Sequence, residues 1–407
     1  MKNVFLIGNG FDLHHMLPTK YFDFMCVGEY IRTNIIRHCS IGDIFSKCSN
    51  NPNLERCYNA HQETFDTTPI DFDKLSELAN IVYDNIWFDY FSKTLNKDLG
   101  WIDFEKEIAL VINTLNNIID DEESNDTSVF VSSADLVARF ILFSFSFFVD
   151  IPKDKDIDYV ADFQIKKQYL KERIYNTNIY VVDKKKIFEY LYEKLLEFSK
   201  ALNLYFDCFI ESTFESLCND DHIKTYKINL LEQADITLSF NYTSTVEKLY
   251  RTEETYHIHG TVDNNKIVLG VNASNNDVVG TNDTALIKFK KYYQREKYET
   301  DVAYINWYRE TIRDKKKYRV VVIGHSLDET DKDIISTMFL NATEIYITYY
   351  DDNCKDDYIA NIVKMFGADG WDKFRKDHRM QFIPLSDIEK LSDNLKNDEI
   401  NWRFSFQ

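Results

Sequence analysis

Short continuous runs of apolar residues mark the strands that we predict for this chain. The runs, or their ends, lie at residues 4–7, 236–240, 257–258, 318–323, 344–350 and 381–384. Such runs are typical of strands that are buried on both faces of a sheet. From about residue 235 onward they alternate with helical segments, and this alternation predicts a parallel sheet.

The pattern changes to helical spacing in the middle of the chain. Apolar residues recur at three- and four-residue spacing in segments 75–95 and 187–217, as in amphipathic helices. The first strand has no parallel neighbour nearby in sequence, so the economical arrangement is one sheet built from residues 1–36 and 225–407. We therefore predict an α/β fold with a Rossmann-like parallel sheet and a large helical insertion at residues 37–224.

Polar side chains and glycines follow four of these strands. The strand ends read GNGFD at residues 8–12, SFNYT at 239–243, HIHG at 257–260 and IGHS at 323–326. Ligands of parallel sheets bind outside the carboxyl ends of the strands. Gly8-Asn9-Gly10 alone is also consistent with a plain structural turn, but the convergence of four such ends predicts a binding site.

Composition narrows the partners that we expect. A net charge of −19 argues against sequence-independent binding of nucleic acid. The most apolar segment, 140–149, is too short to span a bilayer, so we predict a buried helix there and no membrane partner. The N-terminus does not read as a signal peptide, and the odd number of cysteines, seven, predicts reduced thiols and a cytoplasmic location.

One group of residues imitates a metal site. Cys39, Cys48, Cys57 and His61 lie close together in sequence, but their spacing matches no standard zinc motif. Buried free thiols are the favoured interpretation, and we predict that the protein binds no metal.

The order of the strand-end motifs resembles that of the sirtuin-type NAD-binding fold. Its G-A-G-x-S and G-I-P-x-F-R motifs resemble residues 8–12 and 16–21, its T-Q-N-x-D and H-G resemble 239–243 and 259–260, and its G-T-S resembles 324–326. G-N-G-F-D, L-P-T, F-N-Y-T, H-I-H-G and G-H-S-L-D together resemble, more closely, the AbiH family of phage abortive-infection proteins. This resemblance includes the W-x-D-x-E element that begins at Trp101.

The chain also departs from the sirtuin pattern. The four-cysteine zinc module is absent, since no cysteine lies between Cys218 and Cys354. Lys20 and Tyr21 replace the Phe and Arg of the second motif, and Thr243 replaces the Asp of the third. These losses argue against protein deacylation, but they leave cleavage of the nicotinamide–ribose bond as the implied chemistry.

The resemblance implies roles for individual residues. Asn241 would bind ribose hydroxyls or the attacking water, and His259 would take a proton from a ribose hydroxyl, a role that suits the pKa of histidine. We expect both side chains to line a wet crevice, although His259 alone also fits a capping or packing histidine. Asp12 would contact a ribose or a neighbouring histidine, or else cap a helix. The residues implied to contact NAD are Gly8, Asn9, Gly10, Phe11, Asp12, Pro18, Tyr21, Gly324, His325, Ser326 and Asp351.

The resemblance thus implies an antiphage effector that binds NAD as a substrate and hydrolyses it. One alternative is a sensor that binds a nucleotide without turnover. Another is a nuclease or other hydrolase, for which the chain has no D-x-D or D-E-x-K spacing after a strand. The resemblance leaves a homo-oligomer and a phage-derived trigger open as partners.

Overall fold

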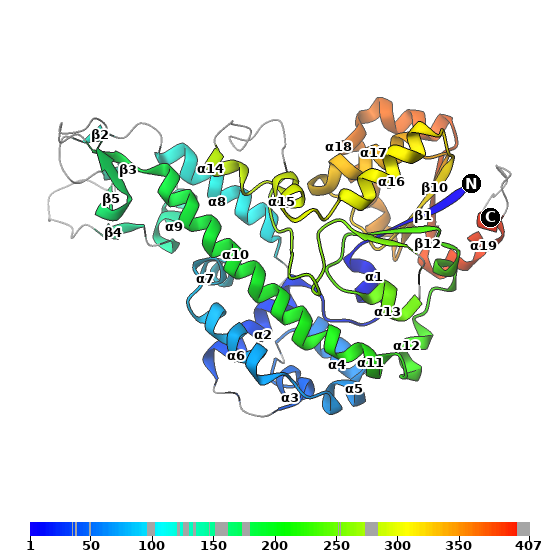
Figure 1. Ribbon diagram of the computed structural model, residues 1–407, viewed down its shortest axis with the longest axis horizontal. Helices are drawn as coiled ribbons and strands as arrows, with labels where there is room; N and C mark the ends of the chain where they lie inside the picture. Colours follow the sequence, from blue (N-terminus) through cyan, green and yellow to red (C-terminus); the bar gives the residue numbers. More distant parts are fainter. Residues whose placement is uncertain are drawn as a thin grey trace. The chain divides into compact units, whose positions relative to one another are not determined.

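The structure of the chain is a computed structural model (Figure 1). It describes residues 1–34, 36, 39–48, 50–95, 102–119, 123–124, 130–132, 136–145, 147–150, 162–172, 180–250, 252, 254–272 and 284–396. The chain divides into two compact units. Unit 1 comprises Met1–Leu78, Leu202–Val268 and Arg295–Gln407, and unit 2 comprises Ala79–Ala201 and Leu269–Gln294. The insertion boundaries predicted at residues 36 and 224 stay a prediction.

Unit 1 contains a six-stranded sheet in which every pairing is parallel. Its strands are β1 (Lys2–Ile7), β8 (Ile236–Ser239), β9 (Thr255–His257), β10 (Tyr318–Ile323), β11 (Glu344–Tyr349) and β12 (Met380–Pro384). They are arranged in the order β12-β11-β10-β1-β8-β9. Counted along the chain, this order is 6-5-4-1-2-3, the order of the doubly wound Rossmann fold. The predicted α/β fold is confirmed.

Both faces of the sheet are covered by helices, as the continuous apolar runs predict. Val4 and Leu6 pack into one hydrophobic cluster, whereas Phe5 and Ile7 pack into the other. Successive side chains of a strand point to opposite faces, so a strand with two buried faces needs apolar residues throughout. In Figure 1, α16 (Val302–Arg313), α17 (Lys332–Asn341) and α18 (Asp352–Lys376) cover the first face. The opposite face is covered by α1 (Asn9–His14), α13 (Thr245–Tyr250) and α19 (Ser392–Lys396).

The remaining helices have the following bounds. In unit 1 they are α2 (Tyr21–Thr33), α3 (Ile41–Phe45), α4 (Pro52–Ala60), α5 (Gln62–Thr67), α11 (Phe214–Leu217) and α12 (Asp221–Thr225). In unit 2 they are α7 (Ile86–Thr94), α8 (Phe104–Ile119), α9 (Leu136–Ser144) and α14 (Thr284–Ile287). The helices with residues in both units are α6 (Phe72–Tyr83), α10 (Lys184–Phe209) and α15 (Lys291–Tyr298). No described helix is long and apolar enough to cross a membrane.

The predicted helical insertion also contains strands. One three-stranded antiparallel sheet consists of β2 (Glu123–Ser124), β7 (Tyr180–Val182) and β6 (Leu170–Glu172). The other consists of β3 (Phe130–Ser132), β5 (Asp162–Ile165) and β4 (Phe148–Asp150). The helix predicted over 140–149 is therefore wrong in its second half, because α9 ends at Ser144 and β4 follows. Trp101, where the W-x-D-x-E element begins, lies outside the described residues.

The single helix predicted over 75–95 is two helices. Between α6 and α7, the side chain of Asn85 accepts hydrogen bonds from the backbone N–H groups of Trp87 and Phe88. Asparagine is a strong N-cap residue because its side-chain oxygen satisfies amides at a helix start. The apolar spacing continues across this break, so periodicity alone did not reveal it.

Candidate functional site

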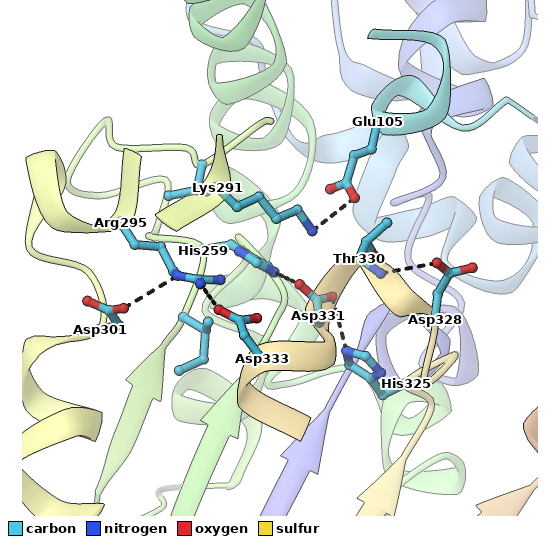
Figure 2. A network of polar contacts seen from close by, with 12 residues as sticks. Glu105, His259, Lys291, Arg295, Asp301, His325, Asp328, Thr330, Asp331 and Asp333 are labelled. Carbon is cyan, nitrogen blue, oxygen red and sulfur yellow. Dashed lines mark hydrogen bonds and ion pairs between the residues drawn. The ribbon is translucent and has the colours of Figure 1, made fainter. Parts of the chain in front are cut away.

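Two buried histidines converge on one carboxylate at the carboxyl edge of the parallel sheet. His259 follows β9, and its Nε2 lies 2.9 Å from Oδ1 of Asp331. His325 follows β10, and its Nε2 lies 3.5 Å from Oδ2 of the same residue. Figure 2 shows the two rings on either side of Asp331. The structure thus brings together the two sequence-predicted histidines through an aspartate that directly precedes α17.

Hydrogen bonds set the tautomer of each ring. The backbone N–H of Leu327 donates to Nδ1 of His325 over 2.9 Å, so the neutral ring carries its proton on Nε2, facing Asp331. His259 donates its Nε2–H to Asp331, which makes Nδ1 the basic nitrogen of the neutral ring. A histidine oriented by a carboxylate in this way is the arrangement of a general base.

The backbone around His325 is held in an uncommon conformation. Gly324 has φ +67°, and Leu327, which is fully buried, has φ +56°. A positive φ in a leucine costs free energy and persists only where the surroundings impose it. The ring of Phe240 packs against both histidines, with centroid distances of 4.3 Å to His325 and 5.5 Å to His259. Packing therefore fixes the orientation of both imidazoles.

Asn241 and Asp12 form a second buried group beside β1. The Asn241 side chain donates from Nδ2 to the carbonyl oxygen of Gly8 over 3.1 Å. The Thr243 hydroxyl donates to Oδ2 of Asp12 over 2.6 Å. Burial raises the pKa of Asp12 to about 6, although hydrogen bonds from Thr243 and its neighbours oppose this shift. The N-cap of α1 is Gly8, so Asp12 does not cap this helix. The partner of Asp12 is Thr243, the residue that replaces the Asp of the third sirtuin motif.

The side chains of Asn241 and His259 are buried rather than wet. They expose 7% and 4% of their surface, so the expectation that both line an open crevice is wrong for this conformation. Each side chain instead has a partner inside the protein, Gly8 for Asn241 and Asp331 for His259.

Two further ionisable groups lie near these residues in the fold. Glu211 accepts a hydrogen bond from the backbone N–H of Ser244 over 2.7 Å, and burial raises its pKa to about 7. Nε2 of His257 lies 2.5 Å from Oε1 of Glu247. Burial opposes protonation of His257, but the hydrogen bond and charge of Glu247 outweigh it, so the pKa of His257 is raised.

The glycine turn after β1 is already filled by backbone contacts. The Gly8 N–H donates to Ile323 O over 3.1 Å, the Gly10 N–H donates to Gly324 O over 2.8 Å, and the Phe11 N–H donates to Gly8 O over 2.9 Å. A Cβ on Gly8 would lie 2.5 Å from the Cα of His325. The glycines therefore allow two turns to pack together. These three N–H groups have acceptors within the protein, and the predicted contact of Gly8, Gly10 and Phe11 with NAD stays a prediction.

The other residues implied to contact NAD have structural partners. The Asn9 side-chain oxygen accepts from Thr19 over 2.7 Å, and the carbonyl oxygen of Pro18 accepts from Tyr205 over 2.7 Å. The hydroxyl oxygen of Tyr21 lies 3.4 Å from that of another tyrosine, Tyr242.

Ser326 and Asp351 lie at the carboxyl ends of β10 and β11. Ser326 is exposed, and its carbonyl oxygen accepts from Asn361 over 3.0 Å. Asp351 caps α18 by accepting from the backbone N–H of Cys354 over 2.8 Å, which lowers its pKa. Its observed role is thus helix capping, and its predicted contact with an adenosine ribose stays a prediction.

The cysteine cluster has other roles in the structure. His61 bonds through Nε2 to the carbonyl oxygen of His15 and through Nδ1 to Asp220, at 2.9 and 3.2 Å. Burial raises the pKa of the Cys48 and Cys57 thiols to about 12, which disfavours the thiolate form that binds metals. Among the described residues no group of three potential ligands is placed to hold a metal ion. The prediction of no metal awaits elemental analysis.

Asp331 and Glu211 were not identified as site residues from the sequence. Asp331 lies in a D-E-T-D segment that indicates the start of a helix, and Glu211 lies near the end of a long helical run. Both reach the site through contacts between residues far apart in sequence, 72 positions for the Asp331–His259 pair. The G-H-S-L-D motif ends three residues before Asp331, and this proximity was the signal in the sequence that could have identified Asp331.

Comparison with known proteins gives one match. No curated protein and no solved structure is significantly similar to the chain. A family model described as bacteriophage abortive infection AbiH matches residues 4–350, which include most of β1, all of β8, β9, β10 and β11, and the histidine pair. The chain therefore belongs to the AbiH family of bacteriophage abortive-infection proteins, and its role lies in abortive infection.

Proposed function

We propose that the chain is an abortive-infection effector that binds NAD and hydrolyses its nicotinamide–ribose bond. The observation that carries this proposal is the His259–Asp331 pair at the carboxyl edge of a sheet with Rossmann strand order. In such sheets dinucleotides bind where the strand order reverses, which here is between β1 and β10. The glycine turn follows β1 and His325 follows β10, so these residues, among those implied to contact NAD, flank this point.

Each residue has a defined part in the proposed reaction. Nicotinamide leaves with the bonding electron pair, which neutralises its charged ring, and water adds to the ribose carbon and loses a proton. Nδ1 of His259 accepts a proton from the water or from a ribose hydroxyl, while Asp331 stabilises the resulting imidazolium. Asn241, whose Nδ2 is held by Gly8 O, offers its side-chain oxygen to a ribose hydroxyl. Asp331 is thus a positioning residue.

A sensor that binds a nucleotide without cleaving it is the second candidate. The occupied amides of Gly8, Gly10 and Phe11 favour this alternative, because a pyrophosphate gains no backbone donors from them in this conformation. A turnover enzyme would have to hold the phosphates with side chains or open the turn.

Incubation of the purified protein with NAD separates the candidates. Nicotinamide release is measured by chromatography and NAD binding by calorimetry, each with and without lysate of phage-infected cells. The His259→Gln variant in the same lysate controls for other NAD-cleaving enzymes. Release that depends on His259 supports the hydrolase, and binding without release supports the sensor. If the protein neither binds nor cleaves NAD, with the lysate or without it, both candidate functions are contradicted.

A further inference from the structure

One cavity in unit 1 is lined by positively charged side chains, unlike the rest of this acidic chain. Its volume is about 430 Å³, and most of the residues that line it belong to α12, to α13 and to the segment that connects them. Three lysines line it, Lys224, Lys227 and Lys248. None of the residues that line it belongs to the His259 site. In a chain with a net charge of −19, three ammonium groups around one concavity mark a local reversal of sign.

Two of these lysines form weak ion pairs with exposed carboxylates. Lys224 pairs with Asp221 at 2.6 Å, and Lys227 pairs with Glu232 at 3.0 Å. Such exposed ion pairs contribute little free energy, so a more highly charged ligand displaces them readily. Lys248 forms no ion pair with any residue that the structure describes. The cavity therefore presents cationic groups that the protein does not neutralise firmly.

The floor of the cavity is neutral and fully hydrogen-bonded. The Tyr250 hydroxyl donates to Nε2 of His15 over 2.6 Å and accepts from the Ile228 N–H over 2.9 Å. His15 in turn donates from Nδ1 to Phe11 O over 2.8 Å. Burial lowers the pKa of His15 to about 3, so this ring carries no charge at neutral pH. The charged side chains that line the cavity are therefore the three lysines and Glu232.

We propose that this cavity binds a small molecule that carries phosphate groups, at a site distinct from the one proposed for NAD cleavage. Its volume lies within the range of small-molecule sites, and it is too small for a folded partner. Lysine ammonium groups bind phosphate as point charges. Ile223 and Leu249 supply apolar walls for the organic part of the ligand.

Calorimetry with pyrophosphate and with adenosine monophosphate tests the proposal. We expect Lys248→Glu to weaken binding by about tenfold or more, because it replaces an attraction by a repulsion at short range. Lys364→Glu makes the same charge change at an exposed position of α18 outside the cavity, and should alter affinity less than about twofold. Glu232→Gln should strengthen binding, because it removes the carboxylate that competes for Lys227.

The relative affinities for adenosine monophosphate and pyrophosphate show which part of the ligand the cavity binds. Stronger binding of the nucleotide assigns the apolar walls to a base or sugar, and equal binding assigns the site to the phosphates; both support the proposal. Failure of the parent to bind either probe, unchanged affinity in Lys248→Glu, or equal losses in Lys248→Glu and Lys364→Glu overturns it. The experiment is independent of NAD cleavage, since His259→Gln should retain this binding whether or not the parent hydrolyses NAD.

Discussion

The turns after β1 and β10 are two regions that look alike in sequence and differ in structure. Each follows a parallel strand that is buried except for Lys2 at the start of β1, and each contains glycine. In the turn after β1, the N–H groups of Gly8, Gly10 and Phe11 donate hydrogen bonds to backbone carbonyl oxygens. In the loop after β10, the side chain of His325 points toward Asp331. Glycine at a strand end thus indicates a close approach of backbone, but the approaching partner here is the other turn. The side chains that can take part in chemistry, Asn241, His259 and His325, follow β8, β9 and β10.

The largest effect that we expect comes from filling this contact. In Gly324→Ala the new Cβ would lie 2.2 Å from the backbone nitrogen of Phe11, at a φ of +67°. We predict a loss of about 4 kcal/mol or more in unfolding free energy, measured with denaturant. Gly367→Ala is the matched control, because its φ is +72° and nothing lies within 4 Å of the added atom. Equal losses in the two variants would show that the contact between the turns contributes nothing.

The histidine side of the comparison is tested by removing the charge of Asp331. Asp331→Asn should lower nicotinamide release by about a hundredfold, because the imidazolium of His259 loses its stabilising carboxylate. The pH profile of the rate should also shift, which a merely structural residue would not cause. Asp328→Asn, at a helix cap three positions away, should keep the parent rate. Matching losses in both variants would remove Asp331 from the proposed mechanism.

Asp12, beside the first turn, predicts a stability change with pH. Its pKa in the folded protein, about 6, lies above the ordinary value of 3.8. The protonated form therefore stabilises the fold below about pH 4, and this contribution is lost as pH rises through 6. Asp23 and Glu211 have raised pKa values and act in the same direction. Relative to the parent, Asp12→Asn should gain about 2 kcal/mol between pH 4 and pH 7. Parallel stability curves for parent and variant would contradict the raised pKa.

The smallest effect concerns Asp351, which follows β11. Asp351→Asn should retain thermal stability, because asparagine caps helices as well as aspartate does, whereas Asp351→Ala should lower the melting temperature slightly. If Asp351 also accepts a ribose hydroxyl, the Asn variant should bind NAD more weakly at unchanged stability. Unchanged NAD affinity in Asp351→Asn would confine this residue to capping.

The parallel sheet was predictable because its signals are local. Strands such as residues 4–7 and 318–323 are buried on both faces and therefore need apolar side chains at successive positions. Such a run of apolar residues can be recognised within a short segment of the sequence. The short antiparallel sheets in residues 123–182 were not predicted, since strands of two to four residues leave almost no periodic signal. The break at Asn85 was hidden for the opposite reason, because apolar spacing continued across it.

The candidate site was predictable only in part. Strand-end motifs located Asn241, His259 and His325, because the ends of parallel strands meet at one edge. Asp331 and Glu211 were missed because their roles arise from long-range packing. The hydrogen bonds of Asp12 and of the N–H groups in the turn after β1 depend on how closely two backbone segments approach each other. Residue types alone do not specify this distance.

The most direct test of the central claim is nicotinamide release by His259→Gln beside a melting curve. Glutamine retains a donor for Asp331 but has no nitrogen that accepts a proton near neutral pH. We predict a folded variant with nearly unchanged NAD affinity and a turnover rate lower by about a hundredfold or more. A well-folded His259→Gln variant that releases nicotinamide as fast as the parent would contradict the claim.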